Sequence, residues 1–566
     1  MRASIKAVIF DLDDTLYDCF GSLVEASRRR AAEALVGAGL PMSAEGAVTL
    51  QKELADVRGP YFLVFDEIVR RYGLSDDARR EAYMAYNSEE VAEIAPFPDV
   101  IPTLRMLRRQ GVKCLLLSSG YHRRQAAKLK KLGLEHEFDE VLVNDLDRGV
   151  LLSECIRYLL SKHDLQAAEV LIVGDRPAAE IRIGNELGLL SVQMLHGRFS
   201  MVEPRDQFEV PTFRITHIFQ VPTILRLAEM GKMPDNLRIV ALGGGTGLPI
   251  VLEGCKTYCR NLTAIVAVTD SGRSSGKLRE ELGILAPGDI RNCLVALSEP
   301  GERERRLNEL FQYRFRNGSL EGMSIGNLVI AAMTDMTGSF EKGIKSISRL
   351  LNIRGKVLPS TITDCHICAE LEDGRMVERE VSVRGLNKPP IRRVFLKPGE
   401  VEALEETVEE ISRADILVLG PGSLFTSVMP NVLVPRVRQA ILESRAVKLY
   451  VCNIVTQPGQ TDGFAASDHY NALSRHIGVD AIDWVLVNST LPDEKIMERY
   501  RKEGAELVAA DAGIEKLRVK VAATDLMEDI AAARVLWEKQ DLLRHHPDKL
   551  ADAICRLYGK MELYKP

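Results

Sequence analysis

The sequence has no long apolar run and no leader-like start. None of its apolar stretches approaches the about 20 residues that a helix needs to cross a bilayer. The N-terminus passes into a predicted strand within five residues, without a charged segment that leads into a cleavable apolar run. We therefore expect a cytoplasmic protein with no membrane partner.

A surplus of positive charge is also missing. The 566 residues include 74 Lys and Arg against 80 Asp and Glu, for a formal net charge of -6, so a nucleic-acid partner is disfavoured. Cysteine is sparse, and 10 residues spread along the chain indicate reduced core thiols instead of a disulfide framework. With 46% hydrophobic residues the chain can bury large cores, and its length predicts about two to four domains.

What the sequence does contain, close to its start, is a pair of carboxylates directly after a predicted buried strand. Asp11 and Asp13 follow the apolar run 8–10 and precede Thr15. On an extended segment they point to the same side, where Asp11 can attack phosphorus and Asp13 can protonate the leaving oxygen and later activate water. Mg²⁺ is the oxygen-seeking ion that carboxylates and phosphates share. The pattern therefore predicts magnesium-dependent phosphoryl transfer.

This DxDxT pattern resembles the first motif of the haloacid dehalogenase (HAD) superfamily, and later segments resemble other motifs of that family. The apolar run 114–117 ends at Ser118, which the resemblance assigns to a phosphoryl oxygen. The apolar run 170–174 precedes Asp175, with Glu180 beyond it. The resemblance implies a Mg²⁺ shell formed by Asp11, Asp13, Asp175 and Glu180.

The third motif of that family normally supplies a lysine. The segment 145–152 offers only Arg148, which we assign to that catalytic role. Lys128 and Lys131 lie in the helix predicted after the second motif, and we interpret them as solvated surface charges. A HAD fold retained without catalytic activity is the alternative to a working hydrolase.

Residues 17–96 are rich in Ala, Arg, Glu and Leu at helical spacing and are predicted to form a helical cap. The resemblance implies that this cap closes over the phosphate site and selects a small phosphorylated metabolite. Alternating strands and helices continue to about residue 229, which predicts a parallel sheet covered on both faces.

A short polar turn then separates two predicted domains. We predict a HAD-like phosphatase domain at residues 1–230, a linker at 231–236 and a second domain at 237–566. The predicted fold class is α/β, with two Rossmann-like parallel-sheet modules, the first with an inserted helical cap.

The second domain opens with an apolar strand and the loop Gly243-Gly244-Gly245-Thr246-Gly247. Its glycines let backbone N–H groups approach a phosphate at a helix N-terminus. The loop matches neither the dinucleotide fingerprint nor the lysine-bearing P-loop. Asp270 lies 23 residues past Gly247. An alternative interpretation therefore stays open, in which Asp270 is the ribose-binding acid of a Rossmann reductase.

Further polar loops stand at predicted strand ends or helix starts, where open α/β sheets bind ligands. They supply carboxylates, hydroxyls and amides, and they span residues 269–276, 287–292, 326–327, 420–427 and 453–461. Each of these loops also has a purely structural explanation, because Asp289 can cap its helix and Gly-Pro-Gly is common in turns. Five such loops in one half of the chain favour a ligand site.

This ensemble resembles the family that contains the 2-phospho-L-lactate transferase CofD and the gluconeogenesis factor YvcK, with the closer likeness to the YvcK branch. The likeness is carried by PGDIRNCLVAL, GPGSLFTS, the loop 456–459 and HHPDKLADAI. It implies ligand contacts from Gly244, Gly245, Thr246, Gly247, Asp270, Ser274, Ser275, Asp289, Asn292, Asn327, Gly422, Ser423, Thr456 and Gln457. The chain departs from the family pattern at Ser271, where a second acid is common, and at Arg273 and Met323.

The YvcK branch is associated with UDP-activated sugars, whereas the CofD branch moves a phospho-lactyl-type group from a nucleotide diphosphate donor. We expect a bifunctional protein in which a Mg²⁺-dependent phosphomonoester hydrolase is joined to a domain that binds a UDP-sugar or related nucleotide diphosphate. Two alternatives stay open for the second domain: a 2-phospho-L-lactate transferase that uses a guanylyl donor, and a non-catalytic metabolite-sensing scaffold. The sequence also leaves open a homo-oligomer.

A few isolated residues resemble fragments of sites. Cys365 and Cys368 lie in an alternating run without a second ligand pair nearby, so we favour a plain strand over a metal site. His469 is interpreted as a structural histidine in preference to a base. His545 and His546 are predicted to lie at the surface.

Overall fold

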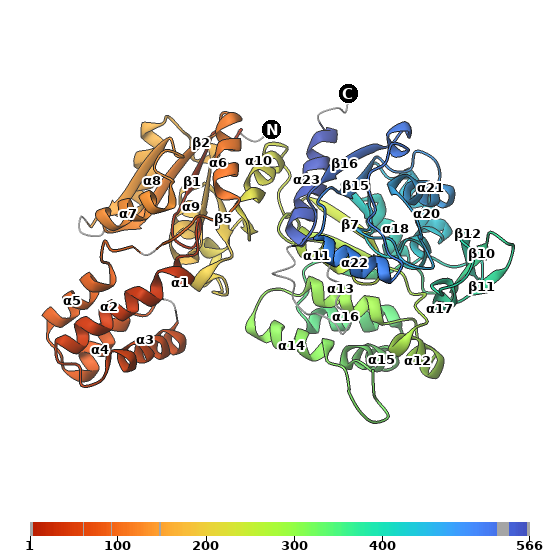
Figure 1. The fold of residues 1–566 in the computed structure, drawn as a ribbon, viewed down its shortest axis with the longest axis horizontal. Helices are drawn as coiled ribbons and strands as arrows, with labels where there is room; N and C mark the ends of the chain where they lie inside the picture. Colours follow the sequence, from red (N-terminus) through yellow and green to blue (C-terminus); the bar gives the residue numbers. More distant parts are fainter. Residues whose placement is uncertain (1–3, 60, 92, 146–148, 529–542, 563–566) are drawn as a thin grey trace. The chain divides into compact units, whose positions relative to one another are not determined.

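The computed structural model describes residues 4–59, 61–91, 93–145, 149–528 and 543–562 (Figure 1). Contacts within the chain divide it into two units, Met1–Gly231 and Lys232–Pro566. Each unit has its own parallel sheet. The segment 231–236, predicted as a linker, falls at the boundary between the units.

The first unit is built on a six-stranded parallel sheet in the order β3-β2-β1-β4-β5-β6. Its strands are β1 (Ala7–Phe10), β2 (Lys113–Gly120), β3 (Glu140–Asp145), β4 (Val170–Gly174), β5 (Leu190–Met194) and β6 (Phe213–Ile215). Helices outside the cap are α6 (Val100–Arg109), α7 (His122–Leu132), α8 (Leu152–Lys162), α9 (Arg182–Leu187) and α10 (Val221–Glu229). Strands β1 and β4 are buried throughout, because a parallel sheet is covered on both faces.

The helical cap follows β1. It consists of α1 (Cys19–Ser22), α2 (Val24–Gly37), α3 (Ala44–Arg58), α4 (Val64–Tyr72) and α5 (Asp76–Tyr86). Ser43 and Ser75 accept backbone N–H groups at the starts of α3 and α5, which satisfies donors of the first turn. The chain enters the cap after Leu16 and leaves it at Phe97, whose N–H donates to the Leu16 carbonyl at 3.0 Å.

The second unit is built on a seven-stranded parallel sheet in the order β16-β15-β14-β13-β7-β8-β9. Its strands are β7 (Arg238–Gly243), β8 (Asn261–Val266), β9 (Lys356–Pro359), β13 (Ile416–Leu419), β14 (Val447–Val451), β15 (Trp484–Asn488) and β16 (Lys520–Thr524). Helices between β7 and β9 are α11 (Gly247–Cys255), α12 (Arg273–Leu282), α13 (Gly288–Leu297), α14 (Glu302–Gln312), α15 (Ile325–Thr337) and α16 (Phe340–Leu350). Later helices are α18 (Glu405–Ser412), α19 (Met429–Val432), α20 (Pro435–Glu443), α21 (Ala466–Ile477), α22 (Glu494–Lys502) and α23 (Pro547–Glu562).

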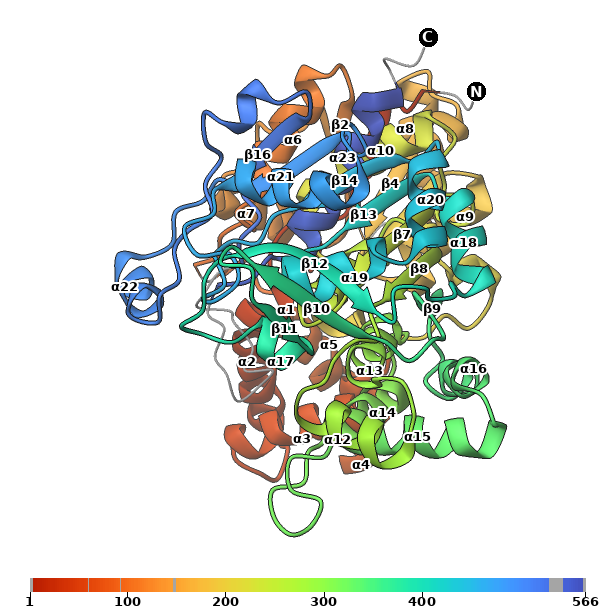
Figure 2. The same cartoon turned by 90° about the vertical axis from the view of Figure 1, so that its right-hand side faces the viewer.

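A small antiparallel sheet is inserted between β9 and α18. Its strands are β10 (His366–Leu371), β11 (Met376–Glu378) and β12 (Ile391–Lys397), with β10 in the middle. The short helix α17 (Glu380–Val383) packs on β10. This group lies at the right-hand edge in Figure 1 and faces the viewer in Figure 2. The Cys365–Cys368 segment runs into β10, so its interpretation as a strand is confirmed.

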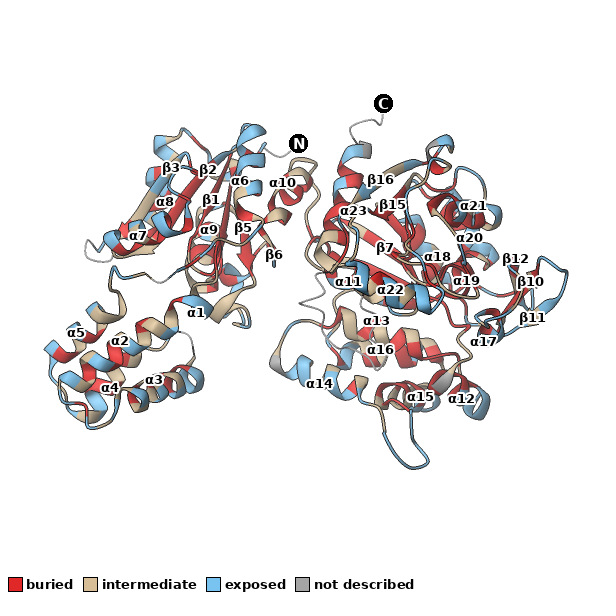
Figure 3. Ribbon diagram, viewed as in Figure 1, coloured by how far each residue is buried: buried red, intermediate tan, exposed pale blue. Residues whose placement is uncertain are grey.

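Buried residues concentrate along the strands of both parallel sheets, and exposed residues lie on the outer faces of the helices (Figure 3). The predicted fold class, two parallel-sheet α/β modules with a helical cap in the first, is confirmed. All ten cysteines are free, and all except Cys19 are buried. Within the described ranges, no helix has the length and apolar character needed to span a membrane.

Candidate functional sites

The first site lies at the carboxyl ends of β1, β2 and β4, which are neighbours in the sheet. Asp11 follows the last residue of β1, and its N–H donates to the Val173 carbonyl of β4 at 2.9 Å. Asp175 follows β4, and Ser118 lies near the end of β2. Because parallel strands end at the same edge of a sheet, the structure brings the predicted Asp11, Ser118 and Asp175 together.

Three buried carboxyl groups crowd this edge. Asp11 is 4% exposed, Asp175 3% and Glu180 2%. Burial and then the Glu180 charge raise the pKa of Asp11, while burial and then Asp11 raise the pKa of Asp175. Arg176 pairs with Glu180 and opposes both shifts. Three acids against one arginine leave excess negative charge, and their oxygens are ligands that Mg²⁺ prefers. This donor set therefore fits the predicted magnesium ion.

Asp13 differs from Asp11 and Asp175 because donors occupy its carboxylate, as Arg176 does for Glu180. Lys128 Nζ lies 2.8 and 2.7 Å from its two oxygens, while the Tyr17 hydroxyl donates at 2.5 Å and Gln125 at 3.3 Å. Burial by itself raises the pKa of Asp13, but the Lys128 charge and these hydrogen bonds lower it to about 2. Asp13 therefore stays a predicted metal ligand, and its carboxylate is paired with Lys128 in this structure.

Lys128 comes from α7, and its predicted position on the solvated surface is wrong. The residue is 4% exposed. Lys131, one turn further along, has 45% of its side chain exposed and pairs with Glu93, so its prediction is confirmed. Arg148, predicted to supply the cation of this site, lies outside the described residues. Lys128 is a buried cation that sequence reasoning missed.

The helical spacing of apolar residues in α7 indicates that Lys128 is buried. Gln125, Lys128, Leu129 and Leu132 follow the spacing of one helix face, and all four are buried. Gln125 supports the same interpretation, because its amide nitrogen donates to Ser118 Oγ at 2.6 Å as well as to Asp13. One face of α7 therefore contacts both Ser118 of the second motif and Asp13 of the first motif.

The second site is built on loops at the carboxyl ends of β7 and β13, which are adjacent in the sheet. The glycine-rich loop leads from β7 into α11, where Thr246 is the N-cap residue. The Gly245 N–H donates to Asp289 Oδ2 at 2.6 Å. Asp289 lies in the first turn of α13, and its carboxylate holds the glycine-rich loop through this hydrogen bond. This role differs from the helix cap that the sequence left open for Asp289.

The glycine-rich loop and the Gly-Pro-Gly loop touch through their backbones. A Cβ on Gly247 would lie 2.3 Å from the Pro421 carbonyl oxygen, so glycine is required for this approach. Gly422 has φ of 144°, and a Cβ there would lie 3.2 Å from the Gly244 carbonyl oxygen. The predicted glycines of the two loops are thus brought together.

Asp270 and Asp289 share this site with a third acid, Glu380, that sequence reasoning missed. Glu380 opens α17, and its Oε2 accepts the Ser271 N–H at 3.2 Å. Burial, and then hydrogen bonding to Asp270, raise the pKa of Glu380 to about 8. Burial and the Asp270 charge raise the pKa of Asp289 to about 6. Arg384 pairs with Glu380 at 3.2 Å and adds a cation beside the acids.

The starts of α12, α13 and α15 are joined by polar contacts. Asn327 donates to Ser274 Oγ at 3.1 Å and accepts from Arg291 at 3.0 Å. The same guanidinium donates to Asn292 at 2.9 Å. Ser275 is buried next to the first residue of α13. Arg291, 2% exposed, is therefore an internal cation that holds these predicted residues in place.

Ser423, Thr456 and Gln457 lie on two linked loops. Ser423 Oγ donates to Gln460 at 2.6 Å, which joins the Gly-Pro-Gly loop to the segment 456–461. The Thr456 hydroxyl accepts the Glu506 N–H at 2.9 Å, and Thr456 is 2% exposed. Thr456 therefore holds the loop, whereas Gln457 is partly exposed beside it.

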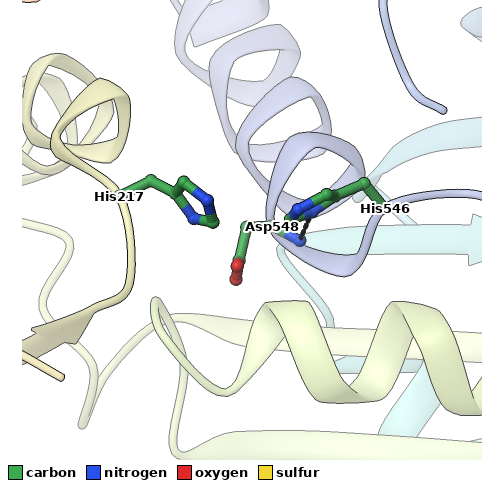
Figure 4. A group of neighbouring side chains, drawn as sticks. All are labelled: His217, His546 and Asp548. Carbon is green, nitrogen blue, oxygen red and sulfur yellow. Dashed lines mark hydrogen bonds between the residues drawn. The ribbon is translucent and has the colours of Figure 1, made fainter. Parts of the chain in front are cut away.

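Two histidines of this unit, His469 and His545, are buried. His469 is fully buried, Tyr450 Oη lies 3.0 Å from its Nδ1, and burial lowers its pKa to about 4. His545 is 5% exposed, so its predicted surface position is wrong. Figure 4 shows His546 and Asp548 at the start of α23, where the Asp548 N–H donates to His546 Nδ1 at 3.2 Å.

Two family models match this sequence. The model described as 2-phospho-L-lactate transferase CofD matches residues 239–527. The model described as haloacid dehalogenase-like hydrolase matches residues 5–188. The two matches fall in different structural units.

Similar proteins of the second unit are bacterial. A gluconeogenesis factor from Halalkalibacterium halodurans is 46% identical over 323 residues, which cover 57% of this chain and 96% of the relative. A gluconeogenesis factor from Bacillus subtilis is 43% identical over 330 residues, covering 58% and 99%. A crystal structure of a upf0052-family protein from Bacillus halodurans is 44% identical, with a TM-score of 0.53 and coverage of 56% and 99%.

Proposed function

Because this chain belongs to the CofD family and carries a haloacid dehalogenase-like hydrolase domain ahead of that family's domain, we propose that it combines two functions. The first unit is a Mg²⁺-dependent phosphomonoester hydrolase. The second unit binds a UDP-sugar or a related nucleotide diphosphate. The observation that supports the hydrolase most directly is the buried set of Asp11, Asp175 and Glu180 beside Ser118.

In this proposal an Asp11 carboxylate oxygen attacks the phosphorus of a phosphate ester, and the bond to the ester oxygen breaks. Ser118 and Lys128 bind oxygens of the transferred phosphoryl group. The proton of the Lys128–Asp13 pair resides on Lys128 Nζ, because the pKa of Asp13 is low, and it passes to the leaving oxygen. The pair then regains a proton from the water that hydrolyses the aspartyl phosphate. Mg²⁺, held by Asp11, Asp175 and Glu180, would supply charge neutralisation for the phosphoryl oxygens.

Removing divalent metal tests the hydrolase. We expect the full chain to release phosphate from at least one ester in a broad panel with Mg²⁺, and EDTA to reduce the rate by at least about 100-fold. Mg²⁺ should restore the rate, while Ca²⁺ should not, because its larger and more flexible coordination shell holds the reacting oxygens less closely. Phosphate release is measured colorimetrically. Full activity in EDTA would refute the metal requirement, and no release from any ester would refute the hydrolase.

The nucleotide proposal for the second unit rests on its two touching glycine loops. Backbone N–H groups at the start of α11 can bind a diphosphate, while Asp270 and Glu380 offer acceptors to ribose or sugar hydroxyls. The contacts of Glu380 favour binding over metal-assisted transfer, because its carboxylate already accepts the Ser271 N–H and pairs with Arg384. The two alternatives, a transferase with a guanylyl donor and a non-catalytic sensor, are tested by the binding measurement described next.

Replacing Asp270 by alanine tests the nucleotide site. We expect UDP-N-acetylglucosamine or UDP-glucose to bind the full chain saturably, and the Asp270→Ala variant to bind at least about 30-fold more weakly, because lost acceptors for ligand hydroxyls are costly. The measurement is isothermal titration calorimetry with and without Mg²⁺. Asp373→Ala, at an exposed turn before β11, is the matched control and should bind like the parent. Mg²⁺-dependent binding of GDP or GTP alone would favour the transferase, and equal binding by both variants would refute the assignment of Asp270.

A further inference from the structure

A cavity of about 480 Å³ lies at the amino end of β2 in the first unit. This end of the strand is opposite to the end that carries Ser118, so the cavity is separate from the phosphoryl site. Its lining comes from the end of α6, the turn into β2 and the residue before β3. Four lining residues are cations and one is an acid: Arg105, Arg108, Arg109, Lys113 and Asp139.

The amino-acid pattern of α6 explains why its basic residues gather here. Val100, Leu104 and Leu107 follow one helix face and are buried, and α6 packs on β2, so the basic residues lie on the exposed side. Gly111 has φ of 81°, which lets the chain turn sharply from the end of α6 into β2. Lys113, the first residue of β2, therefore lines the same cavity as the last turn of the helix.

Two of the four cations are held by carboxylates. Arg105 Nε donates to both oxygens of Glu137, at 3.1 and 3.2 Å. Arg108 Nε lies 3.5 Å from Asp139 Oδ1. The other oxygen of Asp139 accepts the Cys114 N–H at 2.7 Å. These contacts position two guanidinium groups at the cavity, and they leave the acid of the cavity already engaged by donors.

The other two cations have no carboxylate partner. Among the residues that the structure describes, Arg109 and Lys113 form no ion pair with an acid. Lys113 Nζ lies 3.4 Å from His163 Nδ1, and His163 Nε2 lies 2.6 Å from Glu140. The charge of Glu140 is met by Lys162 at 2.7 Å. Two positive charges, those of Arg109 and Lys113, are therefore uncompensated at the cavity.

The helix dipole explains only part of this cluster. Cations in the last turn of a helix are stabilised by the dipole, which accounts for Arg108 and Arg109. It does not account for Arg105, one turn earlier, or for Lys113 in the strand. Like charges around one cavity repel each other, and an oxyanion between them offsets that repulsion. Guanidinium and ammonium groups both donate to phosphate oxygens.

We propose that this cavity binds a ligand with two linked phosphate groups, which is either inorganic diphosphate or the diphosphate of a nucleotide. Arg109 and Lys113 supply the charges that bind it. The volume of about 480 Å³ lies within the about 300–1,000 Å³ that small-molecule sites occupy, so it has room for more than a single phosphate. The site is independent of both proposed functions, because it shares no residue with the phosphoryl site or with the glycine loops.

Calorimetry of the full chain with inorganic diphosphate tests the site. The titrations contain EDTA, so that Mg²⁺ does not compete for the ligand, and about 0.15 M salt, which screens exposed charges beyond about 8 Å. We expect saturable binding that is at least about tenfold tighter than that of inorganic phosphate, because the second phosphate reaches the second uncompensated cation. Equal affinity for phosphate and diphosphate, or no binding of diphosphate, would overturn the proposal.

Variants assign the binding to this cavity. Arg109→Gln and Lys113→Gln should each weaken diphosphate binding about tenfold, and the double variant should weaken it by at least about 30-fold. Both side chains are exposed, so we expect the variants to fold, and circular dichroism verifies this. Lys130→Gln is the matched control, because Lys130 of α7 is exposed and pairs with no acid among the described residues. Its affinity should stay within about twofold of the parent. Full diphosphate binding by the double variant would overturn the proposal.

ADP distinguishes the two sources of the ligand. If ADP binds at least about tenfold more tightly than inorganic diphosphate, and the double variant removes this gain, the cavity takes a nucleotide. If ADP binds no more tightly, the diphosphate group alone is recognised. Both results support the site, provided that binding depends on Arg109 and Lys113.

Discussion

Replacing Asp11 by asparagine is expected to lower kcat/KM for phosphate-ester hydrolysis by at least about 10⁴-fold. The amide has nearly the same shape as the carboxylate, but its oxygen is a poor nucleophile, so no aspartyl phosphate forms. Phosphate release and mass spectrometry of the quenched enzyme measure the two effects. A variant that keeps more than about a tenth of the activity would show that Asp11 is not the nucleophile.

Stability distinguishes this chemical loss from misfolding. Asp11 is one of three crowded buried acids, so removal of its charge should stabilise the metal-free first unit by about 1 kcal/mol, or about 2–4 °C in Tm. Asp139→Asn is the control, since Asp139 accepts the Cys114 N–H at 2.7 Å at the opposite end of β2. That variant should retain activity. A fall in Tm for Asp11→Asn would point to a structural role.

Replacing Lys128 by methionine is expected to reduce kcat/KM by about 100-fold or more and to destabilise the first unit by about 3 kcal/mol. The loss of stability follows because Asp13 would stay buried without its cation. Lys131→Met is the matched control on the same helix, where the ion pair with Glu93 is exposed, and it should change stability by less than about 1 kcal/mol. Urea unfolding and steady-state kinetics measure both effects.

A double variant isolates the pair. Because Asp13→Asn removes the charge that Lys128 neutralises, Asp13→Asn with Lys128→Met should be less destabilised than the sum of the single variants, with a coupling of about 1–3 kcal/mol. Simple additivity would show that Lys128 stabilises the unit through packing of its aliphatic chain, and the catalytic pairing with Asp13 would then need to be abandoned.

Much of both sites could be predicted from local sequence, because the chemistry follows the ends of buried strands. In a parallel sheet these ends converge whatever the distance along the chain, so an apolar run followed by Asp11, Ser118 or Asp175 is enough to group them. The glycine loops were predictable for a similar reason. Gly247 leaves no room for a side chain beside Pro421, and the glycine that this contact requires is visible in the sequence of the loop.

The missed residues depend on distant partners. Lys128 can be buried because Asp13 lies opposite, 115 positions earlier in the chain, and composition alone assigns a lysine to the surface. Glu380 comes from α17, the short helix beside the inserted antiparallel sheet, and meets Ser271 across 109 positions. Only the tertiary fold brings such pairs together, although the spacing of Lys128 with Leu132 in α7 offered a partial signal.

The joint between Leu16 and Phe97 has a consequence for how this hydrolase can diversify. Both ends of the cap meet there at a single backbone hydrogen bond of 3.0 Å. The residues after Tyr17, whose hydroxyl donates to Asp13, therefore form an exchangeable cassette that ends at residue 96: another helical segment with closely spaced ends can be grafted in without displacing Asp11 or Tyr17. Since the entropy of closing a loop rises slowly with its length, cassettes of different size are compatible with one joint. Selectivity can thus be re-engineered by recombination of one continuous stretch, with the reacting groups left untouched.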